Sequence, residues 1–476
     1  MGFMSLFLLA ALIFLGVEAF KPTRNGARRR FVRVEAVSTD FLSKINAGKD
    51  LAIAIDDSGV AVAARDIPEG EVIFSVPIGE CMEVGKAKQA LSWLGEKATK
   101  SLRTGDFGLL ALYLLQEMSA GSGSKYAEYL GNLPANAPGV LGWSADLLEE
   151  YMQSTTRDVA GQIAAIQNDW YIVEAATKAS KDKVLIRDDL LSLEAFTRAF
   201  GLVKAYNLYI EGEPVLAPGI EAIQTETYAE SEAVLDSAGM WGGKLIKLVA
   251  RGESFSKGDE IIMNSGFRSA AECVEDLGTC PDLDVEDCTC EITARIDGEN
   301  EATWDMYWQD KLNVLEAVEV RPSNKFDLEA DDSVEFDPAM IQFLRLKLVR
   351  GQDSFILESI FAPTAYETMA EPFSKENEKA VFEFLLTSAE ACLAKLNKVS
   401  DAASDKAVIE SGSGDDKKAM LAMLREHERA ALESSRTKAQ TMIRILDAAD
   451  TNEYYQERRL REMDLLRPLE EDEIVP

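Results

Sequence analysis

Histidine is nearly absent from this sequence: a single residue, His427, occurs among 476. A Ser-His-Asp triad or a multi-histidine metal site would have to use that residue, which excludes most hydrolase and metal chemistry. Positive charge is also scarce, with 50 Lys and Arg against 82 Asp and Glu and a formal net charge of −32. Nucleic acids and anionic lipids are bound mainly through Lys and Arg, so we expect neither as a partner. No Gly-rich phosphate loop follows a predicted strand.

Long apolar runs are limited to residues 7–17 (FLLAALIFLGV), a stretch too short to span a membrane and typical of a signal-peptide core. Residues 21–34 then carry six basic residues and no acid, as transit peptides do. We predict a cleaved presequence at 1–34 that resembles the bipartite signal of plastids with extra membranes. Secretion with a basic propeptide is the alternative. No other apolar run reaches about 18 residues, so we expect a soluble mature protein without a membrane partner.

The remaining chain predicts mixed secondary structure. Strands flanking a helical insertion at about 86–205, followed by a helical C-terminal region, favour an α+β fold. An acidic Ser/Gly stretch at 400–417 is predicted to be a linker, and 468–476 an acidic tail. Short strands are expected at 51–55, 60–63, 72–77, 245–250 and 260–263, and helices at 109–118, 145–168, 192–201 and from about 337 onward.

Several segments resemble one family when they are taken in order. Residues 59–72 (GVAVAARDIPEGEV) look like the opening motif of a SET domain, where a turn and a strand meet S-adenosylmethionine. Residues 125–134 (KYAEYLGNLP) resemble the insertion of the Rubisco large-subunit lysine methyltransferase class. The segments 340–346, 355–361 and 453–460 resemble the helical substrate-binding domain of that class. The resemblance implies a SET domain at 48–280 with its helical insertion, and an all-α substrate-binding domain at 300–467.

The same resemblance implies a site for methyl transfer from S-adenosylmethionine to a lysine of a protein client. Its Gly-x-Gly turn falls at Gly59, Val60 and Ala61, where the second glycine is replaced and the alanine methyl is expected to crowd the cofactor. Its Asn-His cofactor-binding pair falls at Gln224 and Thr225. An arginine of the family falls at Tyr206, and the two tyrosines that orient and line the lysine fall at Ser265 and Leu277.

These replacements leave two functions open. Losing one oriented hydroxyl from a transition state costs about 10²–10³ in rate, so several losses favour a protein-binding factor with weak or no methyl transfer. The alternative is an active methyltransferase with Rubisco or another stromal protein as client. A divergent site would then be built from nearby groups such as Tyr206, Tyr209 and Tyr228.

Three further groups of residues have possible functional roles: the cysteines, an acidic segment and the single histidine. Cys273, Cys280, Cys288 and Cys290 lack the close pair that is usual in zinc sites, so we predict no metal but leave free thiols, a disulfide and zinc open. Residues 281–340 hold 18 acids and four bases, either as a solvated face or as a surface for a basic, lysine-rich client. His427 lies on the flank of an apolar helical stripe, where we expect a solvated or partly buried side chain.

Overall fold

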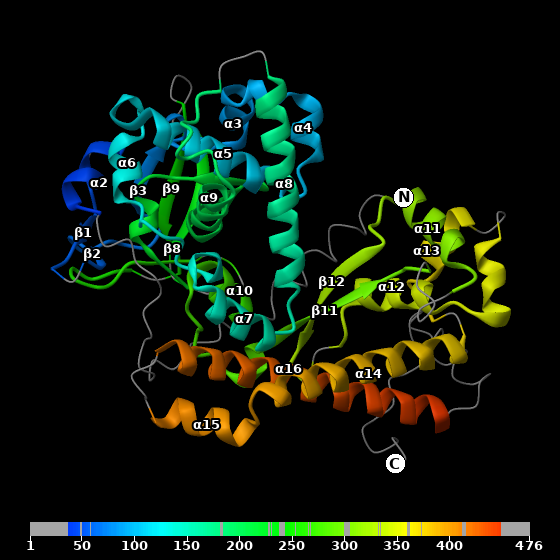
Figure 1. Cartoon of the computed structure of the whole chain (residues 1–476). Helices are drawn as coiled ribbons and strands as arrows, with labels where there is room; N and C mark the ends of the chain where they lie inside the picture. Colours follow the sequence, from blue (N-terminus) through cyan, green and yellow to red (C-terminus); the bar gives the residue numbers. More distant parts are fainter. Residues whose placement is uncertain are drawn as a thin grey trace, which may run out of the picture. The chain divides into compact units, whose positions relative to one another are not determined.

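The computed structural model of the chain (Figure 1) describes residues 37–448 apart from short gaps. The predicted presequence, the acidic tail and the motif at 453–460 lie outside the described residues. None of the described helices is long and apolar enough to cross a membrane. The gaps are 48–49, 58, 181–183, 227–228, 230, 238–242, 253, 265, 267, 299–304, 332, 334, 359–361, 373 and 412–415.

Short strands form the first part of the fold. Helix α2 (Thr39–Ile45) precedes an antiparallel pair of strands, β1 (Ile53–Ile55) and β2 (Ala61–Ala63). A five-stranded sheet has the order β3-β9-β8-β10-β7, in which β10 runs parallel to both of its neighbours. A three-stranded sheet has the order β4-β6-β5. The strands of these two sheets are β3 (Val72–Pro77), β4 (Met82–Glu83), β5 (Asn207–Ile210), β6 (Glu213–Leu216), β7 (Gln224–Glu226), β8 (Ser231–Ser237), β9 (Lys244–Ala250) and β10 (Ile262–Asn264).

Helices fill the chain between β4 and β5, as the sequence predicts for 86–205. Helix α5 is buried from Leu109 to Leu115 and packs against α9, so the two helices form the core of this region. The helix expected at 145–168 is wrong in one respect, because two helices with a break at 154–158 replace it. The helices are α3 (Val84–Ala90), α4 (Glu96–Ser101), α5 (Gly105–Ala120), α6 (Ala127–Asn132), α7 (Ala145–Gln153), α8 (Val159–Ala179) and α9 (Leu193–Tyr206).

The C-terminal region has its own apolar core, built mainly from helices. Helices α14 and α16 pack along each other, with α15 against α16 (Figure 1). The structure adds a two-stranded antiparallel sheet to the helices that the sequence predicts, formed by β11 (Thr289–Arg295) and β12 (Ser323–Glu329). The helices are α11 (Trp308–Ala317), α12 (Pro338–Leu348), α13 (Ala362–Thr368), α14 (Lys375–Val399), α15 (Ala402–Ser411) and α16 (Asp416–Ala448).

The predicted linker at 400–417 is wrong over most of its length, because α15 occupies 402–411. Asp405 of this helix is buried and accepts hydrogen bonds from Arg425 at 3.0 Å and from Arg429 at 2.6 Å, both on α16. The segment therefore has the Ser-rich, acidic composition of a linker, yet one of its acids, Asp405, pairs with the neighbouring helix α16. Composition averages over a segment and does not detect such a single buried partner.

Candidate functional site: a cavity beside the five-stranded sheet

A cavity of about 270 Å³ opens where the end of α9 meets the five-stranded sheet. Apolar side chains form much of its wall, and several hydroxyl, amide and charged groups face it. The described residues that line it are Ala205, Tyr206, Asn207, Leu208, Tyr209, Ile220, Ile223, Thr225, Glu232, Ala233, Met263, Asn264, Gly266, Arg268 and Leu277. A concave site of this kind, with few polar groups among apolar ones, is typical of small-molecule and side-chain binding.

Three of the residues singled out from the sequence, namely Tyr206, Thr225 and Leu277, meet in this cavity. Strand alternation explains why Gln224 does not join them. Successive side chains of a strand point to opposite faces, and Ile223 and Thr225 line the cavity on either side of Gln224. The Gln224 amide is buried, and its Nε2 has no hydrogen-bond partner among the residues that the structure describes.

The predicted turn at Gly59 is present but does not line this cavity. Gly59 has a φ of 70°, a conformation that favours glycine, and the Val60 N–H donates to the Asp56 carboxylate at 2.7 Å. Ala61 is 1% exposed and pairs with Ile55 in the β1–β2 ladder. None of Gly59, Val60 and Ala61 is among the cavity-lining residues. The expected crowding of a cofactor by the Ala61 methyl stays a prediction.

Two other predicted residues, Ser265 and Tyr228, lie outside the described residues. Asn264 and Gly266, on either side of Ser265 in sequence, both line the cavity, and the Gly266 N–H donates to the Asn264 side chain at 2.8 Å. Tyr209, one of the alternative phenols, also lines it, and its ring meets Phe107 edge-on at 5.9 Å.

Sequence reasoning missed two charged residues of the cavity, Glu232 and Arg268. Glu232 forms an ion pair with Arg251 at 3.1 Å. The Nη1 atom of Arg268 is buried and has no hydrogen-bond partner among the described residues. Glu232 lies on β8 beside β10, and strand alternation does not single it out, because the adjacent Ala233 also lines the cavity. Arg268 lies in a loop between β10 and α10 and has no periodic signal.

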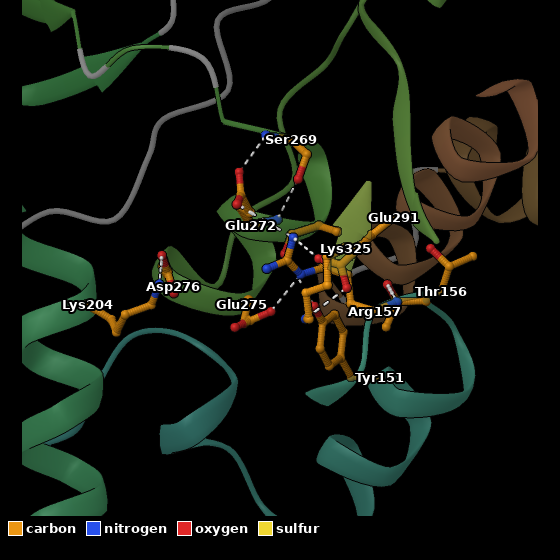
Figure 2. A network of polar contacts seen from close by, with 12 residues as sticks. Tyr151, Thr156, Arg157, Lys204, Ser269, Glu272, Glu275, Asp276, Glu291 and Lys325 are labelled. Carbon is orange, nitrogen blue, oxygen red and sulfur yellow. Dashed lines mark hydrogen bonds and ion pairs between the residues drawn. The ribbon is translucent and has the colours of Figure 1, made fainter. Parts of the chain in front are cut away.

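Leu277 reaches the cavity wall on an unusual turn of helix. Short helix α10 (Ala270–Glu272) begins with a capping box, in which Ser269 and Glu272 exchange hydrogen bonds (Figure 2). It continues into η6 (Cys273–Leu277), a π-helical turn that ends at Gly278 with a φ of 69°. Single π-helical turns are rare and occur frequently at functional sites.

An ion pair fixes one side of this turn. The Lys204 Nζ atom of α9 lies 3.3 Å from the Asp276 carboxylate, as Figure 2 shows. Burial raises the pKa of Asp276 to about 6, although the Lys204 charge acts in the opposite direction. The same ammonium group lies 5.2 Å from the centre of the Phe107 ring. Asp276 and Leu277 are therefore held against α9 at the cavity wall.

The lone histidine is more buried than the sequence predicts. His427 is 7% exposed, and burial lowers its pKa to about 4. Its Nδ1 atom lies 3.8 Å from the Cys280 sulfur, just beyond η6. The expected solvated or partly buried side chain is therefore wrong, because α16 packs this face against the segment after the π-helical turn.

None of the six cysteines forms a disulfide in the structure, and Cys392 is the one that is not fully buried. Burial raises the pKa of both Cys273 and Cys288 to about 12, so neither is a reactive thiolate at neutral pH. Within the described part of the chain, no group of three or more His, Cys, Asp or Glu side chains could hold a metal ion.

Known proteins resemble this chain in sequence and in fold. The family described as "Rubisco LSMT substrate-binding" matches residues 303–432. A tobacco protein named ribulose-1,5-bisphosphate carboxylase/oxygenase large subunit N-methyltransferase, chloroplastic, is 25% identical over 85% of this chain and 80% of its own length. An Arabidopsis thaliana protein named [fructose-bisphosphate aldolase]-lysine N-methyltransferase, chloroplastic, is also 25% identical, over 85% of this chain and 81% of its own.

Solved structures agree on the fold. The SET domain of LSMT bound to lysine and AdoHcy superposes with a TM-score of 0.68 at 21% identity, over 91% of this chain and 96% of that one. Rubisco LSMT bound to AdoMet superposes with a TM-score of 0.64 at 21% identity, over 90% and 95%. The α+β fold expected from the sequence is confirmed. Together, the match at 303–432, the two relatives and the shared fold support a SET-domain protein of the Rubisco large-subunit methyltransferase class.

Proposed function

We propose that this protein binds a protein client through its C-terminal region and transfers methyl groups weakly or not at all. The match of residues 303–432 to a substrate-binding family supports client binding. The relatives named above act on Rubisco and on aldolase, so a stromal enzyme is the client class to test. Both relatives are named chloroplastic, which together with the composition of residues 1–34 favours a plastid over secretion.

The proposal rests mainly on the side chains that form the cavity wall at two positions, Thr225 and Leu277. Resemblance to the family places a histidine and a tyrosine at these positions, and this chain places a short hydroxyl and an aliphatic side chain there. Leu277 is 6% exposed, so an aliphatic side chain is packed into the wall where the resemblance places a phenol. Leu277 has no polar group with which to orient an amine, and Thr225 lacks the imidazole of the family's cofactor-binding pair.

The small size of the cavity also favours weak or no methyl transfer. Sites that enclose small molecules generally have about 300–1,000 Å³, and this cavity has about 270 Å³. The residues that line it also do not include the turn at 59–61, which the resemblance assigns to S-adenosylmethionine. Arg268 and Thr225 could meet a carboxylate or a hydroxyl at one end.

Charge supports a basic client. The segment between η6 and β11 exposes Asp282, Asp284, Glu286 and Asp287, and Val285 among them is 66% exposed. Such a surface attracts a lysine-rich partner and raises its association rate, more so at low salt.

Binding and transfer can be measured separately on the intact chain. Calorimetry with S-adenosylmethionine should show no binding, or binding weaker than roughly millimolar. Immobilised Rubisco and aldolase should bind the chain at roughly micromolar concentration, with a loss of affinity between about 50 mM and about 300 mM salt. Radiolabelled methyl transfer to either protein at a steady turnover would overturn the proposal. So would the absence of binding to both clients and to a whole stromal extract.

An active lysine methyltransferase is the second candidate, because the phenols of Tyr206 and Tyr209 reach the same cavity. One of them could then orient the amine in place of the missing family tyrosines. If transfer is observed, Tyr206→Phe should lower it by about 10²-fold without changing client affinity. Tyr171→Phe is the matched control, since that exposed tyrosine lies away from the cavity-lining set. Equal activity of both variants would exclude Tyr206 from that role.

A further inference from the structure

Arg157 is the meeting point of three parts of the chain. It lies in the break between α7 and α8, and its side chain is 14% exposed. Its Nε atom donates to Glu275 of η6 at 2.9 Å. Its Nη1 atom lies 3.5 Å from Glu272 of α10 and 3.4 Å from Glu291 of β11. Figure 2 shows the three carboxylates around the one guanidinium group. The insertion, the end of the SET core and the C-terminal region thus share this residue.

The carboxylates nearest to Arg157 are themselves buried. Glu275 and Glu291 have side chains that are 6% and 7% exposed. A carboxylate removed from water needs a charged partner, and breaking such a pair leaves an uncompensated charge. Lys325 of β12 also reaches Glu291, at 2.9 Å, but it faces the Oε1 atom, whereas Arg157 faces Oε2. Glu275 depends on Arg157 alone among the ion pairs of the described residues.

The π-helical turn η6 is held from both sides. Arg157 holds Glu275, and Lys204 holds the adjacent Asp276, which precedes Leu277 at the cavity wall. The fit of the turn against the insertion is close: a Cβ on Gly139 would lie 2.0 Å from the carbonyl oxygen of Glu275. A small displacement of η6 therefore moves Leu277 relative to the rest of the cavity, since no free space absorbs it.

We propose that Arg157 is a positioning residue, which sets the cavity wall at Leu277 by holding the π-helical turn to the insertion and to β11 of the client-binding region. The proposal rests on the proposed function, because β11 pairs with β12, which lies within the segment 303–432 that we expect to bind the client. A client that displaces β11 would shift Arg157, then Glu275, and then the wall of the cavity. The guanidinium fork suits this role, since it engages separate carboxylates through separate nitrogens.

Two reporters inside the chain test the proposal without a client or a cofactor. Cys273 begins η6 and is 5% exposed, so its alkylation by iodoacetamide, mapped by mass spectrometry, measures how often the turn opens. Met263 lines the same cavity as Leu277, and its ¹³C-methyl resonance, assigned with Met263→Leu, reports on the wall itself. Cys81, fully buried in the SET core, is the internal reference for global opening.

In Arg157→Gln we expect Cys273 to be alkylated at least about fivefold faster while Cys81 keeps its rate, and the Met263 resonance to shift. The double variant Arg157→Gln/Glu275→Gln removes the orphaned charge and protects the fold. It should still show the shifted resonance, because the connection to the turn is absent. Arg157→Lys keeps the charge but not the fork, and should restore part of the wild-type rate.

Lys325→Gln is the matched control, since it removes a cation from Glu291 without touching η6. It should leave both Cys273 and Met263 unchanged. An unshifted Met263 resonance in both Arg157 variants would overturn the proposal, even if Cys273 becomes more reactive, because Arg157 would then stabilise the turn without setting the wall. Equal acceleration of Cys273 and Cys81 would overturn it too. Neither result bears on whether a client binds or methyl transfer occurs, so the two proposals can fail separately.

Discussion

The carboxylate of Glu428 accepts a hydrogen bond from the Thr155 hydroxyl at 2.5 Å, across more than half of the chain's length. The same carboxylate accepts the Thr156 N–H at 2.7 Å, so it satisfies the backbone where α7 has ended and α8 has not begun. Lys395 of α14 donates to the Thr155 carbonyl at 2.6 Å. The helices of the C-terminal region therefore supply the partners that the broken helix lacks, which explains why the break is stable.

Glu428 gives the first prediction, on pH. It is fully buried, and burial raises its pKa to about 7, although the Thr155 and Thr156 hydrogen bonds act in the opposite direction. The folded state then binds one more proton than the unfolded state between about pH 4.5 and about pH 7, so stability falls as pH rises through that window. Glu428→Gln cannot titrate. The free energy of unfolding of this variant, measured relative to wild type, should therefore rise by about 2 kcal/mol between about pH 5 and about pH 8.

Urea unfolding at several pH values measures this difference directly. Gln keeps one acceptor oxygen and loses one hydrogen bond, so a pH-independent cost of about 1 kcal/mol is expected in addition. The prediction is tested only by how the stability difference between variant and wild type changes with pH. Parallel curves for the variant and the wild type would show that Glu428 is ionised in the folded protein across the whole range.

The neighbouring His427 should act in the opposite sense. Burial depresses its folded-state pKa to about 4, below the value of about 6.5 for an unfolded chain. The unfolded state therefore binds the extra proton, and stability is lost as pH falls from about 6.5 to about 4. Because this is the only histidine, its ring signals in a proton NMR spectrum are unambiguous. They should not move between about pH 5.5 and about pH 8; a midpoint near the ordinary value would contradict the burial.

Much of the fold could be predicted from sequence because it depends on local pattern. The strand at 72–77 and the helical content of 86–205 follow from periodicity, and the structure has both. The break between α7 and α8 could not be predicted. Its residues Ser154, Thr155 and Thr156 are stabilised by α14 and α16, which lie hundreds of residues further along the chain. The same limit applies to α15, where one buried acid outweighs a linker-like composition.

The cavity was only partly predictable. Family resemblance identified Tyr206, Thr225 and Leu277, and the structure brings these three together. Arg157 had no sequence signal, because its three carboxylate partners come from two other segments of the chain. A residue whose role depends on charges that tertiary folding collects cannot be recognised from local spacing.

Asp405 tests the structure of the former linker. Its carboxylate is 1% exposed and faces the guanidinium groups of Arg425 and Arg429. Asp405→Asn leaves two buried cations without a partner charge and should lower the free energy of unfolding by about 3 kcal/mol. Limited trypsin digestion should then cut within 400–417. Glu410 of the same helix is exposed and is not a trypsin site, so Glu410→Ala should change stability by less than about 0.5 kcal/mol. Similar digestion of both variants would restore the view of this segment as a linker.

Gly139 tests the close approach of the insertion to the π-helical turn. A Cβ there would lie 2.0 Å from the Glu275 carbonyl oxygen and 2.7 Å from the Asp276 carbonyl carbon, both of them backbone atoms that cannot rotate away. Gly139→Ala should therefore destabilise the protein by about 1–3 kcal/mol, as overpacking does, and expose Cys273 to alkylation. Gly131→Ala is the control. That glycine is in helix α6 with open space around its Cβ position, and alanine there should be neutral or stabilise by up to about 1 kcal/mol. If thermal and urea midpoints of the two variants coincide, the insertion is not packed against η6 as closely as the glycine geometry requires.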